Sequence, residues 1–372
     1  MITVSNFKIG GFATSNAMTG DTVKIQTQGA VTSDEALFHT LMKGIWGMLF
    51  SQIQKTHPTF TLNEVSRFVI VIHKDHTADI HFNEINIIAE MSAKNAVVAG
   101  QRVFTSDIAD IRRLRFPDIS FADDDRVIAC VRVDWKFGLY FDLRENPKLD
   151  IDLLEATLAH IYRLFNFEAA YLALGNEVLR TTLIHAGWFP FIEIIGGDMD
   201  RLVNAYRDSF NIEAEEKALV DKFTTERIDR IGERWKTISA LKSRTDILAP
   251  ALVAFKAKDP VSCMKIVLTE IEGVLRDAHI LEKGNSVKLN DLLEFAIEKA
   301  ISKTGDGNSL FFPTQFLSYL KDHTFASFDP LNPTTTKASR HSVGHGAAPV
   351  SSYTQTRALQ AILALDQLAF YL

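Results

Sequence analysis

The sequence predicts an α+β N-terminal domain with mixed or antiparallel strands and helices over residues 1–197, and an all-α helical bundle over residues 198–372. The chain length of 372 residues corresponds to about two domains at roughly 100–200 residues each. Strand-like alternation and turn residues occur mainly before residue 145, whereas helical spacing of apolar residues dominates the second half. We place the approximate boundary at Gly196-Gly197, after a β-like run over 188–195.

The N-terminal part begins with short strands and turns over residues 1–31. Ser33 or Asp34 is a suitable cap for a helix whose apolar residues follow at helical spacing, namely Leu37, Leu41, Ile45 and Leu49. Residues 67–73 and 77–88 predict two paired strands. A second hairpin is expected over 126–143, with its turn at Lys136-Phe137-Gly138.

Helices are then expected at residues 150–165, 168–185, 199–210 and 214–242, followed by a short helical turn or two over 251–258. The next helix has strong end signals, because Asp259 caps it, Pro260 occupies its first position and Gly284 follows its end. Asn290 is expected to cap a further helix, and Pro313 to begin another. A Pro/Thr loop is expected over 329–336, and the segment 354–372 predicts a final helix that is apolar on nearly every side.

The composition excludes several classes of protein. Hydrophobic residues make up 47% of the chain and charged residues 23%, as in an ordinary globular protein. A net charge of −6 argues against a protein that coats nucleic acid, although it allows a local basic patch. Cys130 and Cys263 form neither a disulfide framework nor a CxxC pair, which favours the reducing cytoplasm. Neither a signal peptide nor a membrane-spanning run is evident, so no membrane association is expected.

Residues 337–346 read Lys-Ala-Ser-Arg-His-Ser-Val-Gly-His-Gly and contain Arg340, His341 and, after three further residues, His345. This pattern resembles the HEPN signature of an arginine, a polar residue, three residues of any kind and a histidine. It also stands just ahead of an apolar last helix, as in that family. The resemblance covers roughly residues 250–372. It implies a HEPN-like helical bundle and a metal-independent endoribonuclease that needs no cofactor.

In that family the ribose 2′-OH is activated for attack on the adjacent phosphorus of RNA. A histidine can move protons near neutral pH, and an arginine offers a permanent charge to phosphate oxygens. The resemblance therefore assigns His345 as general acid or base and Arg340 as the phosphate clamp. His341 occupies the polar position of the signature and is expected to orient the other two, and Ser342 is a candidate substrate contact.

Two further candidates are one helical turn apart on the helix that starts at Pro260. Glu272 and Arg276 form an ordinary surface ion pair in the simplest interpretation, worth a few tenths of a kcal/mol. In the functional interpretation they orient the motif arginine or contact RNA. We therefore include both, with Ser342, among the predicted substrate-binding residues.

The spacing of the motif suggests a second copy of the chain. Arg340 and His345 would lie about 140° apart on a regular helix, so one helix alone makes a poor site. HEPN proteins commonly bring two motifs into one cleft, and the apolar final helix offers a surface for a homodimer through the C-terminal domain. The expected role is a toxin or anti-phage defence effector, with an antitoxin or regulatory partner. The alternative is a non-catalytic dimerisation or interaction protein whose N-terminal domain binds a ligand or partner.

Other groups remain open alternatives to these assignments. His341 and His345 have the spacing of a helical metal pair, but no third ligand is evident nearby. A second histidine group and an acidic turn also resemble metal ligands, namely His73, His76, His81, Asp123, Asp124 and Asp125. No metal is assigned to either. One aromatic set is interpreted as hairpin packing in preference to a base-stacking platform, namely Trp135, Phe137, Tyr140 and Phe141. One basic set is interpreted as a solvated face in preference to an RNA-binding face, namely Lys236, Lys242, Arg244, Lys256 and Lys258.

Overall fold

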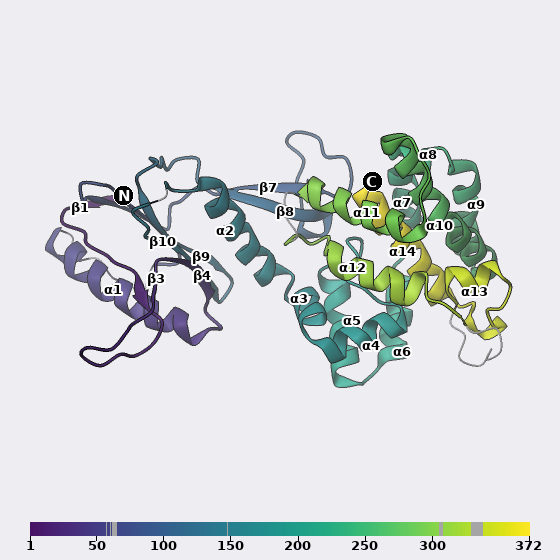
Figure 1. The fold of residues 1–372 in the computed structure, drawn as a ribbon, viewed down its shortest axis with the longest axis horizontal. Coiled ribbons are helices and arrows are strands. Elements are labelled where there is room, and N and C mark those ends of the chain that lie inside the picture. Colours follow the sequence, from purple (N-terminus) through teal and green to yellow (C-terminus); the bar gives the residue numbers. More distant parts are fainter. Residues whose placement is uncertain (57, 60, 62–64, 147, 305–307, 329–337) are drawn as a thin grey trace. The chain divides into compact units, whose positions relative to one another are not determined.

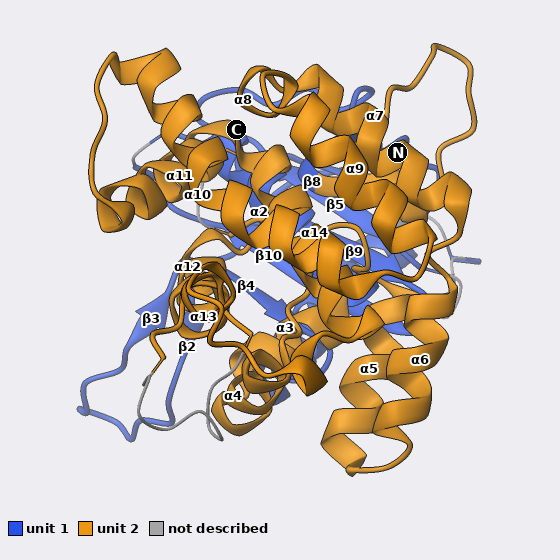
Figure 2. Cartoon of the chain, turned by 90° about the vertical axis from the view of Figure 1, so that its right-hand side faces the viewer, with its two compact units in different colours: residues 1–91, 111–166 blue, residues 92–110, 167–372 orange. Residues whose placement is uncertain are grey.

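The computed structural model describes all of the chain except residues 57, 60, 62–64, 147, 305–307 and 329–337. The predicted Pro/Thr loop over 329–336 lies outside the described residues. The chain forms two compact units, which Figure 2 shows in different colours. Unit 1 comprises residues 1–91 and 111–166, and unit 2 comprises residues 92–110 and 167–372. The sheet-containing N-terminal region and the mainly helical C-terminal part confirm the α+β prediction.

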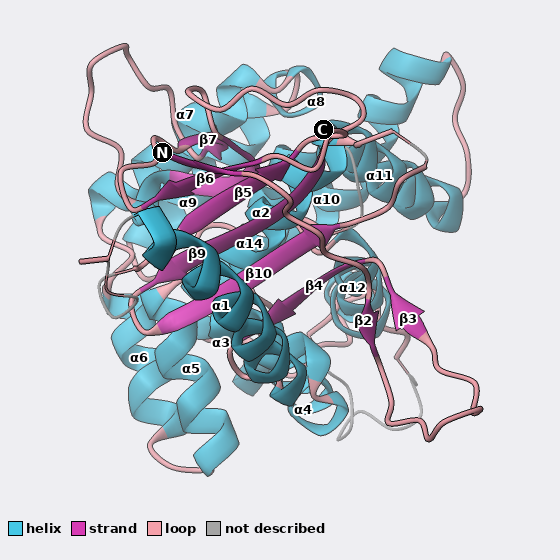
Figure 3. Ribbon diagram, turned by 90° about the vertical axis from the view of Figure 1, so that its left-hand side faces the viewer, coloured by secondary structure: helices cyan, strands magenta, loops and turns pink. Residues whose placement is uncertain are grey.

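Unit 1 is built on a six-stranded antiparallel sheet with the strand order β1-β6-β5-β9-β10-β4 (Figure 3). The strands are β1 Ile2–Val4, β4 Gln28–Thr32, β5 Phe68–Ile72, β6 Ala78–Phe82, β9 Arg126–Val133 and β10 Lys136–Asp142. Short strands β2, Phe12–Ala13, and β3, Ile25–Gln26, pair separately. The strand predicted over 77–88 ends earlier, at Phe82, because Asn83 adopts a positive φ and turns the chain.

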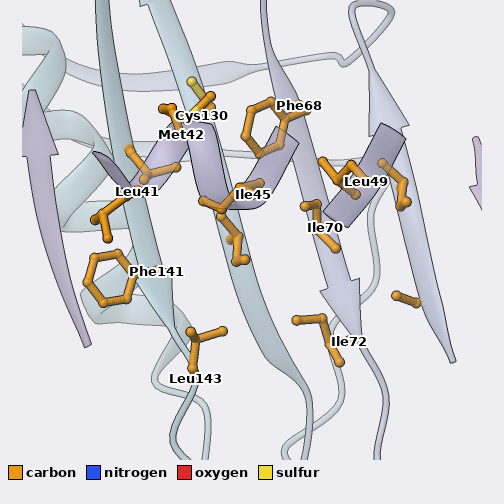
Figure 4. Close-up of a cluster of buried hydrophobic side chains, with 14 of the residues drawn as sticks. Leu41, Met42, Ile45, Leu49, Phe68, Ile70, Ile72, Cys130, Phe141 and Leu143 are labelled. Carbon is orange, nitrogen blue, oxygen red and sulfur yellow. The ribbon is translucent and has the colours of Figure 1, made fainter. Parts of the chain in front are cut away.

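Two helices of unit 1 pack on opposite faces of this sheet. Helix α1, Ala36–Thr56, places Ile45 and Leu49 against Phe68 and Ile70 in one apolar cluster (Figure 4). Helix α2, Ile151–Asn166, contacts β9 and β10. All residues of β5 are buried, which explains why its sequence is an uninterrupted apolar run.

The turn between β9 and β10 differs from the predicted one. Val133 pairs with Lys136, so the turn is Asp134-Trp135, and Asp134 takes a φ of 50°. Gly138 lies within β10 instead. A Cβ atom at this glycine would be 2.2 Å from the side chain of Ile161, so the residue permits helix α2 to approach the strand closely.

Strands β7, Ile88–Ala93, and β8, Ile108–Arg115, form a two-stranded ribbon (Figure 1). The division between the units falls inside this ribbon, because residues 92–110 belong to unit 2. The residues 167–196 also belong to unit 2, so the compact units divide the chain differently from the predicted boundary at 197/198.

The remainder of unit 2 is helical (Figure 1). Its α-helices are α3 Glu168–Gly175, α4 Glu177–Ala186, α5 Gly197–Asp208, α6 Ile212–Asp221, α7 Thr225–Thr237, α8 Ser239–Lys242, α9 Thr245–Lys256, α10 Pro260–Lys283, α11 Leu289–Thr304, α12 Pro313–Tyr319, α13 Arg340–Gly344 and α14 Gln355–Tyr371. The predicted ends of α10 are confirmed, since Asp259 accepts a hydrogen bond from the amide of Ser262 and Gly284 has a φ of 75°. Asn290 is not a cap, because α11 begins one residue earlier, at Leu289.

Two helices predicted as continuous are interrupted by polar caps. The segment 168–185 divides where the Asn176 side chain accepts from the amide of Leu179 and starts α4. The segment 214–242 divides into α6, α7 and α8, with Thr224 capping α7 and Ile238 extended before α8. In both cases a cap residue satisfies the amide groups of a new helix start.

The predicted β-like run over 188–195 is not a strand but a series of turns in the core of unit 2. Trp188, Phe189 and Phe191 are almost completely buried there. The ring of Phe189 lies 5.1 Å from that of Phe316, and the ring of Phe191 lies 5.3 Å from that of Tyr319. These aromatic contacts explain the apolar sequence without a strand.

Helix α14 is surrounded by its own unit. All residues over 358–371 are buried, and α14 contacts α6, α7, α9, α10 and α11. Its polar side chains have internal partners, since Asp366 pairs with Arg234 at 2.7 Å and Gln367 accepts from the amide of Ile192. The helix therefore does not offer the dimer surface that its apolar sequence suggested. Among the described residues, no helix is long and apolar enough to cross a membrane.

Candidate functional site

The motif and the second predicted pair of residues come together between helices α10 and α13. Glu272 and Arg276 occupy successive turns of α10, and Arg340 is the first residue of α13. One Glu272 carboxylate oxygen lies 2.8 Å from Nη2 of Arg340, and the other lies 2.6 Å from Nη2 of Arg276. A single carboxylate thus fixes two guanidinium groups.

The three side chains differ in how far they are buried. The side chain of Glu272 is 15% exposed, that of Arg340 28% and that of Arg276 42%. Two cations sharing one anion leave one positive charge in this cluster. The Nε atoms of both arginines are buried and have no hydrogen-bond partner in the described part of the chain. The terminal nitrogens of the two guanidinium groups are consequently the donors available to a phosphate.

The start of α13 is fixed by two serines. Ser339 accepts a hydrogen bond from the amide of Ser342, and the Ser342 hydroxyl accepts one from the amide of Ser339. This reciprocal capping sets the direction in which Arg340 leaves the backbone. Ser342 is fully buried, which corrects its prediction as a substrate contact: its hydroxyl supports the helix start instead.

The two motif histidines lie in different environments. The ring of His341 is half-buried and lies 6.5 Å from the ring of Phe325. Burial lowers the pKa of His341, and the charges of Arg340 and His345 add to this effect while that of Glu272 opposes it. His341 is therefore neutral near pH 7, able to accept or donate a hydrogen bond.

His345 lies at the exposed end of the motif. It follows the last residue of α13, Gly344, and its ring lies 5.7 Å from the ring of Phe328. The chain then turns at Gly346, whose φ is 69°. The motif is a five-residue helix that ends before His345, so the spacing expected for a regular helix does not extend to this histidine.

Sequence reasoning missed Arg357, which supports the segment from within α14. Its Nη2 donates to the carbonyl oxygen of Ala338 at 2.9 Å, directly before the helix cap at Ser339. Its Nη1 donates to Gln360 at 2.8 Å and also contacts Nε2 of His323. Burial lowers the pKa of Arg357. An arginine inside an otherwise apolar helix was the available signal, because a buried guanidinium requires several acceptors.

The alternative metal ligands adopt ordinary roles. His73 bonds to Asp125 at 2.8 Å and Asp79 at 3.3 Å, and the neighbouring acids Asp123 and Asp124 pair with Lys148 and Lys74. In the described ranges no three His, Cys, Asp or Glu side chains gather as metal ligands would.

The two alternative nucleic-acid surfaces are also largely accounted for by local contacts. Tyr140 and Phe141 are buried in the sheet, whereas Trp135 is 86% exposed at a turn. Three residues of the basic set have acidic partners: Lys236 pairs with Glu233, Arg244 with Glu270 and Asp277, and Lys256 with Asp229.

Comparisons of the chain with models of known protein families, with curated protein sequences and with solved structures gave no match. The functional argument therefore depends on the geometry of the described residues and on the sequence signature alone.

Proposed function

We propose that the chain is a metal-independent endoribonuclease of the HEPN type, with its helical C-terminal part as the HEPN-like bundle. The observation that carries the proposal is the shared carboxylate of Glu272, which holds Arg340 of the signature beside Arg276. Two guanidinium groups with one compensating anion form a cationic pair suited to a phosphodiester. The exposed imidazole of His345 at the end of the same segment supplies the proton-transfer group.

In the proposed reaction the 2′-oxygen of RNA forms a bond to phosphorus as the bond from phosphorus to the 5′-oxygen breaks. A neutral imidazole removes the 2′-OH proton, and a protonated imidazole donates a proton to the leaving 5′-oxygen. Arg340 and Arg276 balance the charge that develops on the phosphorus oxygens. The products are a 2′,3′-cyclic phosphate and a 5′-hydroxyl.

Each chain supplies one exposed motif histidine, so a two-fold homodimer would provide both proton carriers. Because helix α14 is buried, this dimer would form through the exposed surface around α13 rather than through α14. Light scattering at micromolar concentration tests this assembly. A monomer of 41.7 kDa that still cleaves RNA would exclude a shared cleft.

The deciding experiment incubates the purified chain with RNA in the presence of a chelator, beside Arg340→Ala and His345→Ala variants. Cleavage should continue without divalent metal and leave 2′,3′-cyclic phosphate or the derived 3′-phosphate ends. Products with 3′-hydroxyl ends, or a strict requirement for Mg²⁺, would contradict the mechanism. A role as a cytoplasmic toxin or anti-phage effector with an antitoxin partner is part of the proposal through the family resemblance only.

One observation favours a second candidate function, a non-catalytic interaction module. Arg340 is partly buried and already paired with Glu272, as in a structural ion pair. In this case the folded chain would not cleave RNA, and Glu272→Gln would lower stability without changing any activity. If the wild type cleaves RNA and Arg340→Ala does not, the ribonuclease is supported and the non-catalytic module is excluded.

A further inference from the structure

Unit 2 also contains a cavity of about 950 Å³. Its walls come from the connection between β7 and β8, the segment before α5 and the start of α5, the segment that joins α6 to α7, and helix α7. The cavity is large enough for a ligand the size of a nucleotide, since small-molecule sites typically occupy about 300–1,000 Å³. Polar groups that can form hydrogen bonds line one wall, namely Asn95, Gln101, Thr105 and Ser106.

The lining carries more positive than negative charge, in a chain whose net charge is −6. Five cationic side chains face three acidic ones, namely Lys94, Arg201, Lys222, Arg227 and Arg230 against Asp107, Glu193 and Asp198. Two of the acidic side chains already have cationic partners. Asp198 accepts from Lys222 at 2.7 Å and Arg227 at 3.1 Å, and Glu193 pairs with Arg227 and, from behind the wall, Arg234.

Lys94 is the unusual member of this lining. It is only 6% exposed, yet within the described residues its ammonium has no hydrogen-bond or ion-pair partner. The ammonium nitrogen is not among the fully buried polar atoms that lack a partner, so part of its surface is accessible, and Lys94 lines the cavity.

The burial of Lys94 has an energetic consequence. Burial lowers the pKa of Lys94 to about 8, with Arg227 and Arg234 adding to the effect and Glu193 and Asp198 opposing it. A buried ammonium without a partner destabilises the fold. Such a residue is expected where a ligand completes its interactions.

The start of helix α5 adds backbone donors to the same wall. Gly196 and Gly197 both line the cavity, and Gly196 has a φ of 102° that side-chain-bearing residues rarely adopt. The amides of Gly197 and Asp198 have no acceptor among the described residues, and no side chain caps the helix. Free amides at the positive end of a twelve-residue helix favour an anion.

We propose that this cavity binds a small phosphorylated ligand of nucleotide size, with a phosphate held by the ammonium of Lys94 and the amides of Gly197 and Asp198. The excess of two positive charges suits a dianionic phosphate group. Val97, Val103 and Ile195 provide the apolar part of the wall for the remainder of the ligand. This site does not depend on the ribonuclease proposal, because it shares no residue with the α10–α13 cluster.

Isothermal titration of the full chain with pyrophosphate tests the proposal. The wild type should bind, and Lys94→Met should weaken binding at least tenfold while remaining as stable as the wild type or more stable. Lys265→Met is the matched control, because Lys265 is an exposed lysine of unit 2 outside the cavity, and it should bind like the wild type. Gly197→Pro removes one amide donor at a first helical position, where proline is accepted, and should weaken binding severalfold.

Each result is decisive. A wild type that does not bind pyrophosphate, or a Lys94→Met variant that binds as tightly as the wild type, overturns the site. Equal weakening in Lys94→Met and Lys265→Met also overturns it, since that result indicates general charge attraction. If Gly197→Pro binds like the wild type while Lys94→Met binds weakly, the assignment of the phosphate to the helix start is wrong.

Discussion

Glu272 and Arg340 form a 2.8 Å ion pair that joins helix α10 to the first residue of the motif helix α13. The other oxygen of the same carboxylate holds Arg276, so neither arginine is oriented independently of the other. This relationship makes the acid on α10 the residue that determines where both cations point.

Glu272→Gln should therefore reduce RNA cleavage at least tenfold, because the uncharged amide keeps only one acceptor oxygen and cannot hold both Arg340 and Arg276. The variant should also lose about 1–2 kcal/mol of unfolding free energy, more than an exposed pair would, since the Glu272 side chain is mostly buried. Cleavage assays and urea denaturation measure the two effects. Glu282→Gln, on an exposed glutamate of the same helix, serves as the control, and a normal rate in Glu272→Gln would refute the anchoring role.

His345→Ala should lower the cleavage rate by about 10²–10⁴-fold, the usual contribution of general acid–base catalysis. Its thermal stability should remain unchanged because the side chain is exposed. Single-turnover kinetics and a melting curve provide the measurements. His185→Ala removes another exposed histidine of unit 2 and should behave like the wild type. A wild-type rate in the His345 variant would place the chemistry elsewhere.

His341 should make the fold less stable in mild acid. Its pKa in the folded chain is lowered, mainly by burial, so the unfolded chain binds more protons near and below its ordinary value of about 6.5. The contribution of the neutral His341 ring to the unfolding free energy is present above that pH and is lost as the pH falls below it. Denaturation of His341→Asn should accordingly show a smaller loss of stability than the wild type between about pH 7 and pH 5. Parallel curves for the two proteins would contradict this.

Lys94→Met should raise the free energy of unfolding at pH 7. The pKa of Lys94 is about 8 in the folded chain instead of 10.5. Between these two pH values the unfolded chain binds more protons than the folded chain, so the unfolding free energy of the wild type rises with pH. The full effect corresponds to about 3 kcal/mol as an upper bound, at 1.36 kcal/mol for each pKa unit. Urea denaturation from about pH 7 to pH 10 should show this rise in the wild type but not in the variant. A less stable variant would show that Lys94 has a structural role.

Arg357→Met should lower both stability and cleavage. The substitution leaves the carbonyl oxygen of Ala338 and the buried side chain of Gln360 without their donor, at a cost of about 2–4 kcal/mol. The start of the motif segment would then lose a fixed point next to Ser339. Thermal melting and cleavage assays should both show the change, whereas the exposed Arg207→Met should show neither. Normal melting of Arg357→Met would remove this residue from the support of the motif.

Local signals in the sequence were sufficient for several elements of the fold. The cap, the proline and the terminal glycine of α10 act within one helical turn, so the ends of that helix were predictable. The breaks at Asn176 and Thr224 were missed because apolar residues continue in helical spacing on both sides of each cap. The run over 188–195 shows the limit of periodicity, since a short apolar segment is equally compatible with a strand and with buried turns.

The site was predictable only where its members are close in sequence. The spacing of Glu272 and Arg276 indicates their pairing, but the contact of Glu272 with Arg340 depends on how α10 and α13 pack. Burial of Ser342 likewise depends on tertiary structure. Lys94 gave no signal, because a lysine is normally exposed and its neighbours Ala93 and Asn95 do not indicate burial. Its position in a cavity wall with Gly196 and Gly197 follows from the tertiary structure.

The burial of helix α14 also affects how unit 2 folds while the chain is being synthesised. This helix leaves the ribosome after the helices that it contacts in unit 2, and its residues 358–371 are all buried in the folded chain. Until α14 emerges, α6, α7, α9, α10 and α11 lack the central element of their core, and Arg357 cannot yet hold Ala338. A nascent chain that stalls before residue 355 would therefore lack the helix that holds the start of the motif segment in place.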